Sequence, residues 1–152
     1  MRRTVVTVLI IALMLAAAVG FAGGAKEGEE DTVMIGLQGP ITGPWAYEGQ
    51  MARQSCEIAA RLINEKGGIL DGRMIEVHVE DDAGEPKTGA LAATKMAGKK
   101  EVVAAVSTYG SSICEPASDI YEKREMLNVG YGVTAVRLTQ RGFRYFFRTC
   151  GR

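Results

Sequence analysis

The chain has 152 residues, of which 47% are hydrophobic, 7% aromatic and 24% charged, and its 18 basic and 18 acidic residues cancel. This balance excludes an electrostatic basis for binding nucleic acid or an anionic membrane surface. The length is sufficient for one domain with its own core, and the many Ala, Gly, Val and Ile residues favour a layered α/β domain.

The first 31 residues have the layout of an export segment. Two arginines precede an apolar run from Val5 to Ala18, and small residues follow, so we predict a secretory signal peptide over residues 1–22. A membrane anchor is the alternative, but the run is at the short end of the ~20 apolar residues that a spanning helix needs. Removal of the signal leaves 16 basic and 18 acidic residues, a net charge of −2. Residues 23–31 then form an acidic flexible leader.

Strand-like and helix-like segments alternate from Thr32 onward. Residues 32–37 predict a strand, followed by a loop rich in Gly and Pro. Apolar residues then recur at helical spacing from Met51 to Ile63, and two glycines end that helix. Residues 74–79 predict a second strand, and a second helix runs from Pro86 to about residue 98. Residues 102–106 are apolar throughout, which is typical of a strand buried on both faces.

The second half of the chain continues the alternation. It predicts a helix near residues 114–124, a strand at 126–130, a short helix at 135–141 and a fifth strand at 143–148. The order β-α-β-α-β-α-β-α-β predicts a mostly parallel sheet with helices on both faces, a flavodoxin- or Rossmann-like α/β arrangement of three layers. We therefore expect a single ligand-binding domain over residues 32–152.

Ligands of such sheets bind at the loops that follow the carboxyl ends of the strands, here residues 39–49, 107–112 and 130–135. Ser111 and Ser112 stand where a helix begins, so hydroxyls and free backbone N–H groups could receive a carboxylate there. Ser112 and Glu115 also fit the S-x-x-E capping box. We assign Ser112 to the helix cap and Ser111 to the ligand.

The other two loops carry further candidates. Thr134 and the carbonyl of Gly132 could accept hydrogen bonds from an ammonium group, although an ordinary turn is the simpler explanation when they are taken alone. Trp45 and Tyr47, in the Gly/Pro-rich loop, could border an apolar ligand side chain or pack against a neighbouring loop.

The remaining polar residues favour structural roles. Cys56 fits an apolar helix pattern, and Cys114 lies in the first turn of a helix, where thiol acidity can be raised, but no base is near it in sequence. His78 has no companion, and Asp81 and Asp82 favour a strand-end turn over a cation site. No metal-ligand spacing, cofactor fingerprint or serine nucleophile motif is present, so we expect a non-enzyme without metal or cofactor.

Long segments of the chain carry a resemblance to a known family. They read IGLQGPITGPWAYEGQ, INEKGGILDGRMIEVHVEDDAGEPKTGALAATKM, SSICEPASDIYEKREMLNV and RLTQRGFRYFFRT. In this order they resemble the periplasmic leucine/isoleucine/valine-binding proteins, the type I substrate-binding components of branched-chain amino-acid ABC transporters. The resemblance extends from about Thr32 to Arg152.

The resemblance implies a protein of two lobes that close on an amino acid and then meet a membrane permease. In that family the positions of Ser111 and Thr134 contact the ligand carboxylate, and the position of Gly132 offers its carbonyl to the ammonium group. The expected ligand contacts are Ser111, Gly132, Thr134, Trp45, Tyr47, Glu48, Tyr109 and Ser112.

The chain also departs from the family pattern. Some members carry a disulfide where this chain has Gly84 and Gly110, and the aromatic residue usual near Glu48 is shifted to Tyr47 or replaced by Trp45. Family members are considerably longer, so we expect the N-terminal lobe without its C-terminal lobe, in an extracytoplasmic location. Two alternatives stay open: an exported ligand-sensing receptor domain of the same fold, and a binder of amides, urea or aromatic acids.

Overall fold

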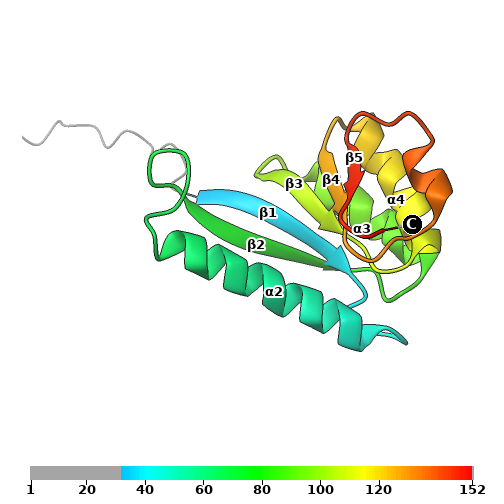
Figure 1. Ribbon diagram of the computed structural model, residues 1–152, viewed down its shortest axis with the longest axis horizontal. Helices are drawn as coiled ribbons and strands as arrows, with labels where there is room; N and C mark the ends of the chain where they lie inside the picture. Colours follow the sequence, from blue (N-terminus) through cyan, green and yellow to red (C-terminus); the bar gives the residue numbers. More distant parts are fainter. Residues whose placement is uncertain (1–31, 152) are drawn as a thin grey trace, which may run out of the picture.

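The computed structural model describes residues 32–151 (Figure 1). The elements in chain order are β1 (Thr32–Gly39), α2 (Ala46–Asn64), β2 (Met74–Asp81), α3 (Pro86–Gly98), β3 (Val102–Ser107), α4 (Ser111–Lys123), β4 (Leu127–Gly130), the 3-10 helix η1 (Val136–Thr139) and β5 (Phe146–Arg148). The signal peptide and leader predicted over residues 1–31 lie outside the described residues. None of the helices within 32–151 is long and apolar enough to cross a membrane.

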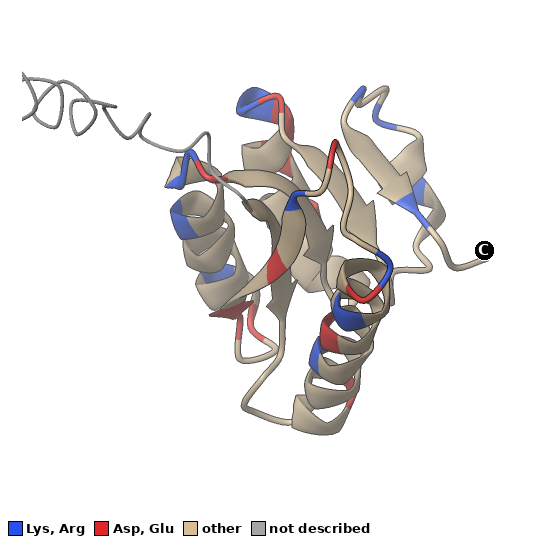
Figure 2. Cartoon of the chain, turned by 90° about the vertical axis from the view of Figure 1, so that its left-hand side faces the viewer, with Lys and Arg blue, Asp and Glu red and all other residues tan. Residues whose placement is uncertain are grey.

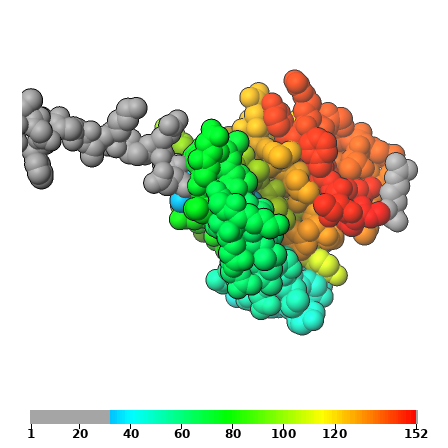
Figure 3. All heavy atoms as spheres, turned by 60° about the vertical axis from the view of Figure 1, so that its left-hand side comes forward, coloured from blue at the N-terminus to red at the C-terminus, as the bar shows by residue number. Residues whose placement is uncertain are grey.

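The five strands form one parallel sheet in the order β2-β1-β3-β4-β5. The helix α2 covers one face of the sheet, and α3 and α4 cover the other (Figure 1). The predicted three-layer α/β fold is therefore confirmed. Because β2 and β5 are the two edge strands, the segments after β4, orange and red in Figure 3, gather at one side of the molecule.

The helix α2 begins five residues before the predicted stretch. Gly49, predicted to lie in the preceding loop, is therefore part of the helix. A Cβ at Gly49 would lie 2.1 Å from the carbonyl oxygen of Pro40, so this glycine permits a close approach between helix and loop and does not mark a turn. Tyr47 and Glu48, predicted to lie in a loop, therefore stand in the first turn of α2. A carboxylate there suits the positive end of the helix dipole.

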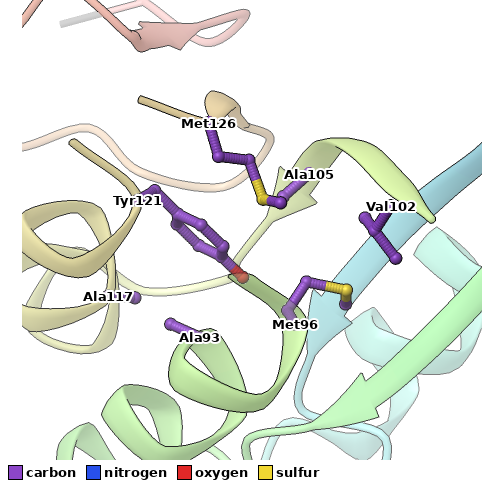
Figure 4. Close-up of a cluster of buried hydrophobic side chains, with 7 residues drawn as sticks. All are labelled: Ala93, Met96, Val102, Ala105, Ala117, Tyr121 and Met126. Carbon is purple, nitrogen blue, oxygen red and sulfur yellow. The ribbon is translucent and has the colours of Figure 1, made fainter. Parts of the chain in front are cut away.

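The principal core lies between the sheet and the pair α3 and α4. Its buried members come from α3, β3, α4 and the turn before β4, and they are Ala93, Met96, Val102, Ala105, Ala117, Tyr121 and Met126 (Figure 4). Three of the seven are alanines, and small side chains allow the two helices to approach each other and the sheet. Met96 reaches β1, where a Cβ at Gly36 would lie 2.4 Å from its sulfur.

Among residues 32–151, α2 is the helix that covers the opposite face of the sheet. Val106 lines a hollow together with α2 residues, and its register partners are Val129 and, one strand further, Phe147. Side chains at paired positions of a parallel sheet lie on the same face, so this apolar row lies on the α2 side. Yet Leu127, two residues before Val129 in β4, and Phe147 are 42% and 54% exposed, and Val103 of β3 is 56% exposed. The predicted burial of residues 102–106 on both faces is therefore wrong for the described chain.

The apolar stripe of α2 is also less buried than its helical spacing predicts. Met51, Ile58 and Leu62 are 44%, 47% and 50% exposed, whereas Ala60 is buried. Charged residues of both signs are interspersed over the helices and loops in the view of Figure 2. The apolar face, defined here as Leu127 and Phe147 on the α2 side of the sheet, accordingly leaves large hydrophobic side chains exposed.

We expect Phe147→Lys to lower both self-association and binding of an apolar fluorescent dye, because the substitution places a charge on this apolar face. The free energy of unfolding should change by no more than about 0.5 kcal/mol, since the side chain is already in water. Dye titration and sedimentation velocity measure the two effects. The matched control is Leu91→Lys on α3, which is 57% exposed and lies on the other side of the sheet. Equal dye binding by the wild type and Phe147→Lys would contradict the expectation.

Candidate functional site

The loops that follow β1, β3 and β4 meet at the carboxyl edge of the sheet. The ring of Trp45 packs edge-on against Tyr109, with ring centroids 5.7 Å apart and an interplanar angle of 71°. Tyr109 and Gly132 form a parallel β-bridge, in which Gly110 N donates to Gly132 O (3.1 Å) and Gly132 N donates to Thr108 O (3.2 Å). The structure thus brings together the three loops that the sequence singles out.

Ser111 is the first residue of α4 and links two of these loops. Its half-buried hydroxyl oxygen accepts a hydrogen bond from Ala135 N at 3.1 Å. The N–H groups of the first residues of a helix have no partner within the helix, and the positive end of the helix dipole lies there. Ser111 therefore combines a hydroxyl, free amides and a favourable potential for an anion.

The predicted capping box at Ser112 is wrong. The N-cap position of α4 is Gly110, with φ of 96° and no side-chain cap bond, and Ser112 is an exposed residue within the helix. Glu115 does not reach back to a cap. It pairs with the guanidinium of Arg137 instead, with Nη2 to Oε2 at 2.8 Å, and these contacts lower the pKa of the Glu115 carboxyl. Arg137 lies 22 residues away, which the local pattern could not show.

Gly132 and Thr134 follow β4. A Cβ at Gly132 would lie 2.4 Å from the ring of Tyr109, so only glycine permits this contact between the two loops. The carbonyl of Gly132, expected to face an ammonium group, already accepts the Gly110 N–H, which leaves one of its two lone pairs. Thr134 is exposed and immediately precedes the Ala135 amide that reaches Ser111.

The aromatic candidates differ in their surroundings. Trp45 is half-buried between the loops and contacts Tyr109, which agrees with the alternative that it packs against a neighbouring loop. Tyr47 is 76% exposed on the first turn of α2, and Glu48 is half-buried beside it. Trp45 and Tyr109 are thus the two aromatic side chains that the structure places together at the meeting point of the loops.

Two adjacent aspartates at the end of β2 hold the same edge of the sheet. Asp81 accepts hydrogen bonds from Ile41 N (2.9 Å), from the amide and hydroxyl of Thr42 (3.2 and 2.6 Å) and from Ala83 N (2.8 Å). Burial acts to raise the pKa of Asp81, but these bonds outweigh it and lower the pKa. Asp81 therefore fastens the loop after β1, which confirms the predicted strand-end turn role.

Cys114 and His78 have structural surroundings, and the Cys150 thiol donates to Val133 O in the loop after β4 (2.9 Å). Cys114 is fully buried, and burial raises the pKa of its thiol to about 12, which is opposite to the increased acidity considered for a helix start. His78 lies in β2 with its Nε2 3.1 Å from Glu80 Oε1. Within residues 32–151, no three His, Cys, Asp or Glu side chains are grouped so that they could hold a metal ion.

Comparison with known proteins gives consistent matches. A family model described as "Periplasmic binding protein" matches residues 32–151. A Leucine-, isoleucine-, valine-, threonine-, and alanine-binding protein from Pseudomonas aeruginosa is 40% identical over 140 residues, which cover 90% of this chain and 36% of the relative. Leu/Ile/Val-binding protein homolog 3 from Brucella melitensis is 38% identical over 146 residues, or 95% of this chain and 38% of the relative. The chain thus spans well under half of the length of these relatives.

Solved structures give the same picture. The branched-chain amino acid transporter substrate-binding protein LivJ from Streptococcus pneumoniae, in complex with isoleucine, superposes with a TM-score of 0.72 at 28% identity, over 77% of this chain and 33% of that one. An ABC transporter substrate-binding protein from Desulfitobacterium hafniense, in complex with Leu, has a TM-score of 0.69 at 27% identity, over the same shares of the two chains.

Proposed function

The chain belongs to the periplasmic binding protein family, and from this membership we propose that it forms a ligand-binding lobe of an extracytoplasmic substrate-binding protein of an ABC transporter. Branched-chain or other hydrophobic amino acids are the proposed ligands. The names of two relatives, 38% and 40% identical, support this class of ligand. The observation that carries the proposal is the meeting of the loops after β3 and β4 at Ser111, Gly132 and Thr134.

The chemistry of these loops suits the charged end of an amino acid, with its carboxylate and its ammonium group. A ligand carboxylate would lie against the start of α4 and accept hydrogen bonds from the Ser111 and Thr134 hydroxyls and from free helix amides. The remaining lone pair of the Gly132 carbonyl would accept from the ammonium group. Trp45 and Tyr109 would then border the apolar side chain of the ligand.

The proposal has consequences for location and partners. A substrate-binding protein works outside the cytoplasm, so we propose that residues 1–22 direct export and that a membrane permease is the partner. Residues 32–152 form the lobe itself. Catalysis has no part in this proposal, because the loops offer hydrogen-bond donors and acceptors for binding without a paired nucleophile and base.

An NMR titration of the isotopically labelled chain with leucine tests this function. The described residues offer these loops from one sheet, so for residues 32–151 we expect an affinity weaker than micromolar, with shifts concentrated at the amides of Ser111, Gly132 and Thr134. Ser111→Ala should weaken leucine binding at least about tenfold, since a hydrogen bond to a charged group contributes roughly 1.5–3 kcal/mol and every 1.4 kcal/mol is about tenfold. Ser55→Ala is the matched control, because Ser55 lies on α2 and its hydroxyl bonds to Met51 O.

Two analogues separate the parts of the site. 4-Methylpentanoate keeps the carboxylate and should still shift Ser111, whereas 3-methylbutylamine lacks it and should not. The proposed function is wrong if leucine at tens of millimolar leaves all three amides unmoved, or if Ser111→Ala and Ser55→Ala bind it equally well.

A further inference from the structure

Asp82 is a carboxylate buried completely beneath the meeting point of the loops. Its side chain is 0% exposed, and its hydrogen-bond partners within the described residues are uncharged. Gly84 N donates to Oδ1 at 3.0 Å, and the Thr108 hydroxyl and the Gln38 amide nitrogen donate to Oδ2, the latter at 3.4 Å. A buried ionised carboxylate is costly unless donors surround it, so this arrangement calls for a physical explanation.

The donors around Asp82 come from different parts of the fold. Gln38, the residue before the last of β1, accepts a hydrogen bond from the Tyr121 hydroxyl of α4 (2.8 Å) and donates to Gly89 O of α3 (3.2 Å). Thr108 follows β3, and Gly84 precedes α3. The carboxylate therefore joins the ends of β1, β2 and β3 to both helices of the core side.

Two of the partners of Asp82, Thr108 and Gly84, also touch the loops of the proposed ligand site. The Thr108 carbonyl accepts the Gly132 N–H, and the Gly132 carbonyl accepts the Gly110 N–H just before Ser111. On the other side, a Cβ at Gly84 would lie 3.4 Å from Trp45 Cε3, so the tryptophan ring lies against this residue. A displacement of Thr108 or Gly84 would consequently move Gly132 or Trp45.

We propose that Asp82 is the positioning residue of the site: its buried carboxylate holds Thr108 and Gly84, and through them fixes Gly132, Gly110 and Trp45 relative to one another. The part of this proposal that concerns a ligand rests on the proposed function. The part that concerns the loops stands on the hydrogen bonds alone and is measurable without ligand.

Burial, the largest cause, raises the pKa of Asp82, and the neighbouring charge of Asp81 acts in the same direction, whereas the bonds from Thr108, Gly84 and Gln38 oppose the rise. The titratable groups that face Asp82 are Asp81 and the hydroxyls of Tyr121 on α4 and Tyr131 after β4. Because the folded-state pKa is raised, this group's contribution to stability is fully present below its unfolded pKa and is lost as the pH rises through the folded pKa. Asp81 has the opposite sign, since its pKa is lowered and its contribution is lost as the pH falls.

The test compares Asp82→Asn with its neighbour Asp81→Asn by amide hydrogen exchange and NMR between pH 3 and 8. Asparagine has only one oxygen, so in Asp82→Asn its NH₂ group would face either the Gly84 N–H or the Thr108 and Gln38 donors. We therefore expect exchange of the Gly132 and Gly110 N–H groups to accelerate at least tenfold. Asp81→Asn should accelerate Ile41 and Thr42 instead. In the wild type, the Gly132 and Gly110 amide shifts should titrate with Asp82, and this titration should vanish in Asp82→Asn but persist in Asp81→Asn.

A second pair of variants covers the case in which Asp82→Asn does not fold. Thr108→Val removes the hydroxyl that Asp82 holds and should reproduce the accelerated exchange at Gly132, whereas Thr108→Ser keeps the hydroxyl and should restore wild-type exchange. If Asp82 had a purely structural role, Asp82→Asn and Thr108→Val would lower the stability, but the Gly132 and Gly110 amide shifts of the wild type would not change with pH. Unchanged exchange at Gly132 in Asp82→Asn, or in Thr108→Val where the former does not fold, overturns the proposal.

Leucine binding provides a separate test of the ligand part of the proposal. If the wild type binds leucine, Asp82→Asn should weaken binding at least fivefold, and unchanged binding would overturn the ligand part of the proposal. If the wild type does not bind leucine while exchange at Gly132 responds to Asp82→Asn, the proposed function is wrong and the positioning of the loops by Asp82 stands.

Discussion

Gly110→Val is expected to lower the free energy of unfolding by about 2–4 kcal/mol and to separate the loops of the proposed site. Gly110 has a φ of 96°, in a region that a β-branched residue adopts only with strain. A Cβ there would also lie 3.0 Å from Trp45 Cζ3 and 3.3 Å from Ile113 Cδ1, so a valine would press on both side chains. Since Gly110 is the N-cap of α4, the start of that helix should fray as well.

Denaturant unfolding measures the loss, and intrinsic fluorescence reports on the loop directly, because Trp45 is the single tryptophan of the chain. Gly142→Val is the matched control. Gly142 has a φ of 71° but no other heavy atom within 4 Å of a Cβ, so its substitution introduces backbone strain without the contact. We expect it to cost about 1–2 kcal/mol and to leave the Trp45 emission unchanged. Equal losses of unfolding free energy for the two variants would show that the contact with Trp45 does not contribute to the destabilisation.

Met96→Ala is expected to destabilise the chain by about 2–5 kcal/mol, because it removes a fully buried side chain from the centre of the principal core. The size of the loss depends on how far β1 and α3 can close the cavity. Leu91→Ala on the same helix is the control, since Leu91 is 57% exposed and its truncation should cost no more than about 0.5 kcal/mol. Thermal and urea denaturation measure both.

A second substitution identifies what Met96 fills. Gly36→Ala alone should destabilise, because its Cβ would lie 2.4 Å from the Met96 sulfur. In the double variant Gly36→Ala/Met96→Ala, the new methyl group enters the cavity that the methionine leaves. We therefore expect the double variant to lose less than the sum of the single losses, a coupling of about 0.5–3 kcal/mol. Strict additivity would place Met96 elsewhere than against Gly36.

The sequence predicted the architecture well, because its signals are local. All five strands and the order of the helices follow from runs and periods of apolar residues, and alternation of strand and helix restricts the sheet to parallel pairing. Parallel strands place all their carboxyl ends at one edge, so the loops after β1, β3 and β4 were also foreseeable as neighbours. The contacts of Trp45 with Tyr109 and of Tyr109 with Gly132 confirm that part.

The details that the sequence missed depend on partners far along the chain. The capping box at Ser112 was mistaken because Glu115 finds Arg137, and Gly49 was read as a loop residue because its contact with Pro40 is visible only in space. The apolar spacing of α2 predicts a core-facing stripe, but spacing does not show how much of the sheet stands opposite, and Ile58 is 47% exposed.

The sequence by itself determined the elements, their parallel arrangement and the edge of the sheet at which a ligand would bind, since these follow from local hydrophobic patterns and from chain handedness. Only the tertiary structure decided how that edge is held. Asp82 meets Gln38 and Thr108, which lie 44 and 26 residues from it, and the Tyr121 hydroxyl reaches Gln38 over 83 residues. A buried carboxylate is tolerable only among such donors, and no local pattern records which donors the fold brings to it.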